Sequence, residues 1–304
     1  MFKYIYFFIL FLTTVIASEP ITPLPKKVEV DEKKALLGKE LFFDTQLSKD
    51  NTISCASCHD LANGGDDGLV VSFGINGKQG DINAPTVYNA VFNISQFWDG
   101  RAHDLQEQAA GPVENPVEMG NSFKALVKKL RRTPYKKKFA AIYKDGITKN
   151  NITDAIAEYE KTLITPDSPF DKYLEGDKDA ISEDAKKGYE LFKTKGCIAC
   201  HQGKNIGGNM YNKFGIFQDT NSTHLGRYNV THNERDKYYF KVPTLRNIAK
   251  TAPYFHDGRT YDLKEAVLLM ARYQLGRKIT NEELDNIVAF LHSLNGQLPP
   301  DIEP

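Results

Sequence analysis

The pattern C-x-x-C-H occurs twice in this chain, and it constrains the fold more than any other feature. The copies are residues 55–59 (C-A-S-C-H) and 197–201 (C-I-A-C-H), which together contain all four cysteines of the chain. Two thiols at this spacing can both form thioethers to one porphyrin edge, and the adjacent imidazole can then ligate its iron. We predict two haem c groups, each held by one motif: Cys55, Cys58 and His59 for the first, and Cys197, Cys200 and His201 for the second.

Two other uses of paired cysteines fit this pattern less well. Two C-x-x-C pairs can bind one zinc ion, but such a site does not need a histidine directly after each pair, and these pairs lie in opposite halves of the chain. A thioredoxin-like redox dithiol has no use for the trailing histidine either. No cysteine is left for a structural disulfide. The duplicated motif therefore favours a protein with two haem groups.

The first 18 residues have the composition of a secretory signal peptide. Lys3 precedes an apolar run over residues 4–16, and the small residues Ala17 and Ser18 follow at the expected cleavage point. The run is too short to span a bilayer comfortably, although an uncleaved anchor is the alternative. Haem is attached to C-x-x-C-H outside the bacterial inner membrane, so we expect a periplasmic protein whose mature chain has no transmembrane segment.

The charge of the chain bears on its partners. The sequence has 39 basic and 39 acidic residues and therefore a formal net charge of zero. A protein that binds nucleic acid usually carries a basic excess. We therefore expect no nucleic-acid partner.

The sequence around the two motifs repeats. Residues 38–42 (G-K-E-L-F) and 188–192 (G-Y-E-L-F) lead into the first and second motif, respectively. Helical periodicity predicts a leading helix over residues 34–43 and closing helices that begin at Thr153 and Thr280, the latter with Glu283 in a capping box. We predict an all-α fold of two cytochrome c-like domains from an internal duplication, 19–165 and 166–304, divided at the proline-rich residues 165–169.

Six longer motifs carry a resemblance to a known family. In order they are N-A-P-T-V at 83–87, Q-F-W-D-G-R at 96–101, E-Q-A-A-G-P at 107–112, N-P-V-E-M at 115–119, V-P-T-L-R-N at 242–247 and P-Y-F-H-D-G-R at 253–259. On these the chain resembles the bacterial dihaem cytochrome c peroxidase family over essentially its whole mature length. The resemblance implies reduction of H2O2 to water, with electrons from a small periplasmic donor, either a monohaem cytochrome c or a cupredoxin. Members of the family are often homodimers.

The resemblance also implies roles for single residues near the first haem, which would be the peroxidatic, low-potential centre. Glu118 would be the distal acid–base residue, because a carboxylate can take a proton from H2O2 and return it to the leaving oxygen. Gln108 would help to hold the peroxide. Trp98, the single tryptophan of the sequence, would lie between the two haems as an electron-transfer bridge.

At the second haem the resemblance implies a methionine as the sixth iron ligand. Met270 lies between the second motif and the closing helix, and Met210 is the competing candidate. Ligation by histidine and methionine raises the potential of a haem, as an electron-receiving centre requires. The resemblance further implies one calcium ion at the domain junction, bound by Asn83 and by the carbonyls of Thr251 and Pro253. His256 lies in the last motif, near a haem edge or the junction, without an assigned role.

The chain departs from many relatives after the first motif, where they carry a histidine that blocks the peroxidatic iron until the other haem is reduced. Ile75 occupies the matching position, and isoleucine cannot ligate iron. We predict a first haem that is open without reductive activation; the alternative is capping by Lys78. Two other functions compete with a peroxidase. One is a dihaem electron carrier, and the other is a dihaem enzyme that oxidises a protein substrate, for which the resemblance implies tyrosine in place of Met270.

Overall fold

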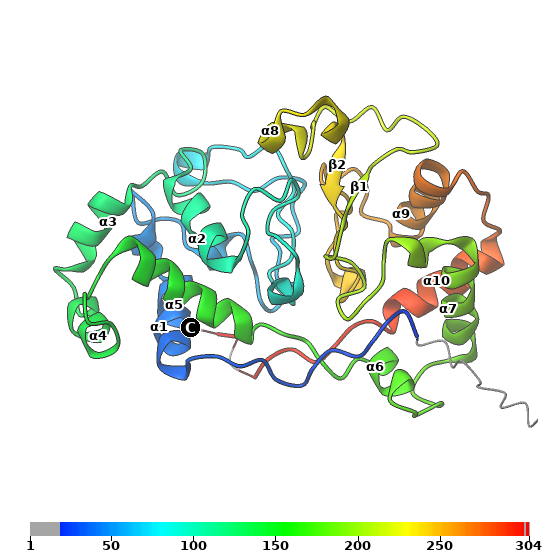
Figure 1. The fold of residues 1–304 in the computed structure, drawn as a ribbon, viewed down its shortest axis with the longest axis horizontal. Coiled ribbons are helices and arrows are strands. Elements are labelled where there is room, and N and C mark those ends of the chain that lie inside the picture. The colour runs from blue at the N-terminus through cyan, green and yellow to red at the C-terminus, as the bar shows by residue number, and fades with distance from the viewer. Residues whose placement is uncertain (1–18, 301, 304) are drawn as a thin grey trace, which may run out of the picture.

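The computed structural model describes residues 19–300 and 302–303, and it is mainly helical (Figure 1). The predicted signal peptide lies outside the described residues. The helices are α1 (Glu32–Phe43), α2 (Leu105–Glu114), α3 (Phe123–Leu130), α4 (Tyr135–Ile142), α5 (Lys149–Thr162), α6 (Pro169–Leu174), α7 (Glu183–Lys195), α8 (Tyr228–Thr231), α9 (Leu263–Met270) and α10 (Asn281–His292). The helical class is confirmed. The sequence did not indicate a short antiparallel ladder, β1 (Tyr211–Lys213) with β2 (Tyr239–Lys241).

Side-chain caps explain where the leading and closing helices begin. Asp31 accepts from the backbone N–H groups of Lys33 and Lys34 at the start of α1. The predicted capping box of Thr280 and Glu283 is confirmed at the start of α10. The predicted start at Thr153 is wrong, because α5 begins one turn earlier, after the Thr148 cap. The Thr153 hydroxyl instead bonds to carbonyls of the preceding turn, inside the helix.

Both halves of the chain repeat the same helix crossing, α1 on α5 and α7 on α10. At the first crossing a Cβ placed on Gly38 would lie 1.8 Å from the Ala155 carbonyl oxygen. At the second, a Cβ on Gly188 would lie 1.9 Å from the Asn286 carbonyl oxygen. Both glycines are the first residue of the repeated G-x-E-L-F sequence. The glycines allow the two backbones to touch, and the equivalence of the crossings supports the proposed duplication.

The two ends of the chain each pack on the opposite half. Figure 1 shows the first described residues running along the second half before they reach α1, while the last residues return from α10 towards α1. Ile21 is buried in the core that contains Phe170 and Tyr189. Leu298 and Ile302 pack against the first-half core that contains Phe42 and Tyr159. Within the described residues, these two segments and residues 163–168 therefore run from one half to the other.

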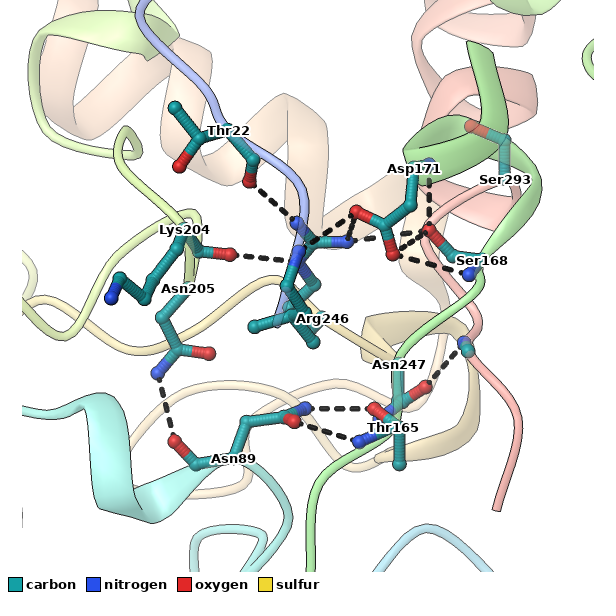
Figure 2. A network of polar contacts seen from close by, with 12 residues as sticks. Thr22, Asn89, Thr165, Ser168, Asp171, Lys204, Asn205, Arg246, Asn247 and Ser293 are labelled. Atoms are coloured by element: carbon teal, nitrogen blue, oxygen red, sulfur yellow. Dashed lines mark hydrogen bonds and ion pairs between the residues drawn. The ribbon is translucent and has the colours of Figure 1, made fainter. Parts of the chain in front are cut away.

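A buried ion pair fixes the crossing segments to one another (Figure 2). The guanidinium of Arg246 lies 2.6 Å from the Asp171 carboxylate, with the two side chains 0% and 2% exposed. The same guanidinium donates to the carbonyls of Thr22, 3.1 Å away, and Lys204, 3.0 Å away. A buried charge requires such complete pairing. One side chain thus connects the N-terminal segment, α6 and the loop that follows the second motif.

Three asparagines and a threonine continue this network at the predicted domain boundary (Figure 2). The Asn89 side chain donates to Thr165 Oγ1 at 2.8 Å and accepts from the Thr165 N–H at 2.9 Å. Asn247, from the second half, also donates to Thr165 Oγ1 at 2.8 Å. Asn205 donates to the Asn89 carbonyl at 3.3 Å. The residue that begins the proline-rich linker is therefore held by side chains from both halves.

Candidate functional site

The first motif presents a histidine that is oriented to bind metal. Cys55 lies on a tight 3-10 turn that ends at Ser57, and the N–H of His59 donates to the Cys55 carbonyl at 3.1 Å. The Nδ1 atom of His59 lies 3.0 Å from the Gly65 carbonyl oxygen. Donation from Nδ1 leaves the Nε2 lone pair free for a metal. Burial lowers the pKa of His59 and so favours the neutral imidazole that ligation needs.

The second motif has the same local structure. Cys197 begins a 3-10 turn, and the N–H of His201 donates to the Cys197 carbonyl at 3.1 Å. Burial lowers the pKa of His201 to about 4, although the Ile206 and Pro243 carbonyls oppose this shift. Among the described residues, Nδ1 of this buried ring lacks a hydrogen bond such as the one between His59 and the Gly65 carbonyl. The ring is therefore neutral and suited to ligate iron.

The cysteines themselves do not resemble a redox dithiol. In the described residues all four are free of disulfides and partly buried. Burial raises the pKa of Cys58 and that of Cys197 to about 11, whereas reactive thiols have a lowered pKa. The histidine that follows each pair, partly buried His59 or buried His201, has a lowered pKa instead. The residues present therefore fit a covalently attached haem in each half.

Glu118 lies close to the first motif, on the turn that follows α2. Its side chain is partly buried, and Asn115 donates a hydrogen bond of 2.5 Å to Oε1. Desolvation raises the pKa of Glu118, and the Asn115 bond opposes that shift. The carboxylate in turn raises the pKa of Cys55 and Cys58 electrostatically. A carboxyl group with a raised pKa beside a haem motif is suited to move protons.

A loop over residues 72–80 packs directly on this turn. Ile75 is 4% exposed, and its N–H donates to the Glu118 carbonyl at 2.8 Å. Gly74 allows the approach, because a Cβ there would lie 2.1 Å from the Val117 carbonyl oxygen. The Lys78 ammonium donates to the Pro116 carbonyl at 2.9 Å. The loop thus places Ile75 next to Glu118 and attaches Lys78 to the same turn.

Gln108 is less closely tied to Glu118. It lies partly buried on α2, whose C-terminal end leads into the turn with Glu118. Among the described residues, no hydrogen bond joins the two side chains. The structure therefore places Gln108 on the neighbouring element, without a hydrogen bond to Glu118 among the described side chains.

Trp98 lies where the two halves meet. Its indole Nε1 donates to the Asn83 carbonyl at 2.9 Å, and its own carbonyl accepts from the Lys241 N–H at 2.8 Å. Its ring meets the His256 ring edge to face, with centroids 6.1 Å apart. Asn83 belongs to the first half, and Lys241 and His256 belong to the second. The tryptophan is therefore held from both sides of the junction.

His256 has a structural place that the sequence did not reveal. The side chain is 3% exposed, stacks on Phe240 with centroids 4.2 Å apart, and has Nε2 2.8 Å from the Ser222 hydroxyl. Desolvation lowers the pKa of His256 to about 4. A neutral, packed histidine here supports the Trp98 ring. The aromatic residues around it in Y-F-H-D-G were the feature of the sequence that could have indicated this packing.

The residues predicted to bind calcium lie at the same junction. Asn83 donates from Nδ2 to the Leu69 carbonyl at 2.8 Å, and its N–H donates to the His256 carbonyl at 2.9 Å. This leaves Asn83 Oδ1 as the side-chain atom that can act as a ligand. Thr251 and Pro253 lie on the loop that leads to His256. No group of three or more His, Cys, Asp or Glu side chains within the described ranges could hold a metal, so the predicted site depends on amide and carbonyl oxygens, which suit calcium.

Met270 is the last residue of α9, and a π-helical turn, Ala271–Leu275, follows it. Turns of this kind often occur at functional sites. Val267, three positions earlier and so on the same helix face, packs against the core that Cys197 also contacts. Met210, the competing candidate, precedes β1, and its backbone carbonyl accepts from the Val242 N–H at 2.9 Å. Met270 therefore shares a helix face with a residue that packs against this core, and its ligation of the second iron stays a prediction.

Comparisons with known proteins agree with this arrangement. A family model described as di-haem cytochrome c peroxidase matches residues 32–179, and a cytochrome c model matches residues 185–295. The cytochrome c551 peroxidase of Nitrosomonas europaea is 49% identical over 287 residues, which cover 93% of this chain and 86% of that protein. The chain belongs to the di-haem cytochrome c peroxidase family. The predicted family is thereby confirmed.

Other relatives extend the comparison. The cytochrome c peroxidase Ccp of Escherichia coli K12 is 52% identical over 290 residues, or 93% of this chain, which spans only 62% of that relative's length. A crystal structure of a MauG-like protein associated with microbial copper homeostasis superposes with a TM-score of 0.79 at 26% identity, covering 91% of this chain and 93% of the other.

Membership of the di-haem cytochrome c peroxidase family confirms the predicted class, an oxidoreductase that acts on peroxide, and the two-domain architecture; it supports the prediction of two haem c groups. Each family model covers one of the two C-x-x-C-H motifs. Over residues 19–300 and 302–303, no helix combines the length and the apolar character needed to cross a bilayer.

Proposed function

We propose that this protein reduces H2O2 to two waters at the first haem, with electrons that enter at the second haem from a small periplasmic donor, a monohaem cytochrome c or a cupredoxin. The observation that carries the proposal is the partly buried Glu118 carboxylate beside the first motif, with its pKa raised. When bound, haem supplies an iron that binds peroxide and exchanges electrons with it.

The residues of the first half have distinct tasks in this proposal. His59, held by the Gly65 carbonyl, would ligate the iron of the first haem. Glu118 accepts the proton of the bound peroxide and returns it to the leaving oxygen. Asn115, which donates to Glu118 Oε1, keeps the carboxylate in one orientation. Gln108 helps to position the peroxide.

The residues of the second half and the junction supply electrons. His201 and Met270 would ligate the second iron, and such a pair would raise its potential. Trp98 lies on the route between the haems, because it contacts both halves through Asn83 and Lys241. A calcium ion at Asn83, Thr251 and Pro253 would hold the same junction together.

We further propose that the first haem is open in the oxidised protein. Ile75, which has no ligating atom, packs beside Glu118, and the Lys78 ammonium is bonded to the Pro116 carbonyl. An electron carrier would close both irons with strong ligands, whereas no such ligand is evident in the sequence for the first iron. Met270 in place of tyrosine argues against the class that oxidises a protein substrate.

A peroxide assay tests the function and the open site together. We expect the fully oxidised protein, mixed with H2O2 and reduced cytochrome c, to turn over without a lag and at the same rate as protein reduced beforehand by one electron. The EPR spectrum of the oxidised protein should show a high-spin first haem. Turnover only after reduction would contradict the open site, and no turnover in either sample would contradict the peroxidase.

The raised pKa of Glu118 predicts how turnover depends on pH. A carboxyl group that acts as a base must be ionised, so kcat/KM for H2O2 should fall as the pH drops through the pKa of Glu118. Desolvation raises this pKa, so the fall should begin at a higher pH than an ordinary glutamate would give. Asn115→Ala removes the bond that favours the carboxylate and should move the fall to still higher pH. A shift to lower pH, or none, would contradict this role of Asn115.

A further inference from the structure

Lys241 is a buried basic residue without an acidic partner. It ends β2, and the residue is 6% exposed. None of the ion pairs between described residues includes it. Burial alone lowers the pKa of Lys241 to about 8, with no carboxylate opposing the shift. Burying an ammonium is unfavourable unless an anion pairs with it, and the described residues around Lys241 provide none.

The lysine lies at the junction of the two halves. Its N–H donates to the Trp98 carbonyl at 2.8 Å. Across the ladder it pairs with Tyr211, so the two side chains share one face of the ladder. Tyr211 contacts the first half there, with its hydroxyl 2.6 Å from Ser95 Oγ. Lys241 therefore faces the first half, beside the residue proposed to connect the haems.

The same strand leads directly to the second haem motif. Two residues after Lys241, the Pro243 carbonyl raises the pKa of His201 and so lies near its ring. On the opposite face of the ladder, the Asn212 side chain lies 3.0 Å from Cys200 Sγ. The lysine is thus placed between Trp98 and the strand residues that contact the second motif.

Haem c brings its own carboxylates to this region, because each porphyrin carries two propionates. We propose that Lys241 forms an ion pair with a haem propionate at the junction. The proposal rests on the proposed haem sites but not on peroxide reduction. A cation held beside a haem disfavours the more positive ferric state, so the pair raises the potential of the haem whose propionate it binds. Lys241 then acts as a positioning residue that also tunes electron flow.

The test measures the midpoint potentials of both haems in the holoprotein by spectroelectrochemistry. We expect Lys241→Met and Lys241→Gln to lower the potential of one haem by ~59 mV. For a one-electron couple this shift is a tenfold change in the ratio of ferrous to ferric haem at a given potential. Lys241→Arg, which keeps the charge, should shift it less. The haem that responds identifies whose propionate is bound. Unchanged potentials in the neutral variants would overturn the proposal.

Lys237→Met is the matched control. Lys237 lies four positions earlier, and its ammonium is 2.7 Å from the Glu234 carboxylate on the surface. Removing this already paired charge should leave both potentials unchanged. Haem content and circular dichroism show whether each variant is folded. If Lys241→Met does not fold, Lys241→Gln provides the same test. If a Lys241 variant loses peroxide turnover without a change in either potential, that result also contradicts the ion pair. If the protein does not reduce peroxide but its Lys241 variants have a shifted potential, the ion pair is supported.

Discussion

Glu118→Gln should remove most of the peroxide turnover while both haems remain bound. Glutamine keeps the size of the side chain and can still contact Asn115, but it cannot accept the proton of H2O2. General acid–base groups typically contribute about 10²–10⁴-fold to a rate, so we expect a loss of that order in kcat/KM for H2O2. A steady-state assay with reduced cytochrome c measures it, and the absorbance of the haems reports their content.

Glu114→Gln provides the control for this substitution. Glu114 ends α2, four positions before Glu118, and its exposed side chain pairs with Lys149 at 2.9 Å. Surface pairs of this kind contribute little, so turnover should stay normal. Normal turnover in Glu118→Gln would remove Glu118 from the mechanism. A loss of haem in that variant would show that its role is structural.

Gly188→Ala should destabilise the second half strongly. The added Cβ would lie 1.9 Å from the Asn286 carbonyl oxygen and 2.9 Å from the Phe290 Cβ. Backbone atoms cannot yield as a flexible side chain can, so α7 and α10 must move apart. Overpacking of this kind typically costs about 1–3 kcal/mol and sometimes more. The free energy of unfolding in denaturant, followed by circular dichroism, should fall by at least this amount.

Two further glycines show whether the crossing is responsible. Gly38→Ala should have the same effect in the first half, because the Ala155 carbonyl occupies the equivalent position. Gly80→Ala is the control, since a Cβ there meets nothing nearer than the Ser72 carbonyl oxygen, at 3.4 Å. If Gly188→Ala and Gly80→Ala unfolded at the same denaturant concentration, the helices would not cross as described.

The sequence predicted correctly those features that depend on residues close together along the chain. The haem motifs, the leading helices and the capping box at Thr280 all depend on residues a few positions apart. The start of α5 was misplaced because two threonines, Thr148 and Thr153, can both cap a helix, and packing against α1 decides between them.

The junction was beyond such reasoning because its contacts join residues far apart in the sequence. Arg246 meets Thr22 and Asp171, and Trp98 meets Lys241 and His256. No spacing rule connects these positions. The family resemblance supplied Trp98 and Asn83, but the buried lysine beside them was found only in three dimensions.

The exchange of chain ends between the halves has a consequence for how the protein folds. Because Leu298 and Ile302 pack against the first-half core, that core lacks part of its packing until the last residues of the chain are in place. The stability of the first half therefore depends on the end of the chain as well as on its own helices.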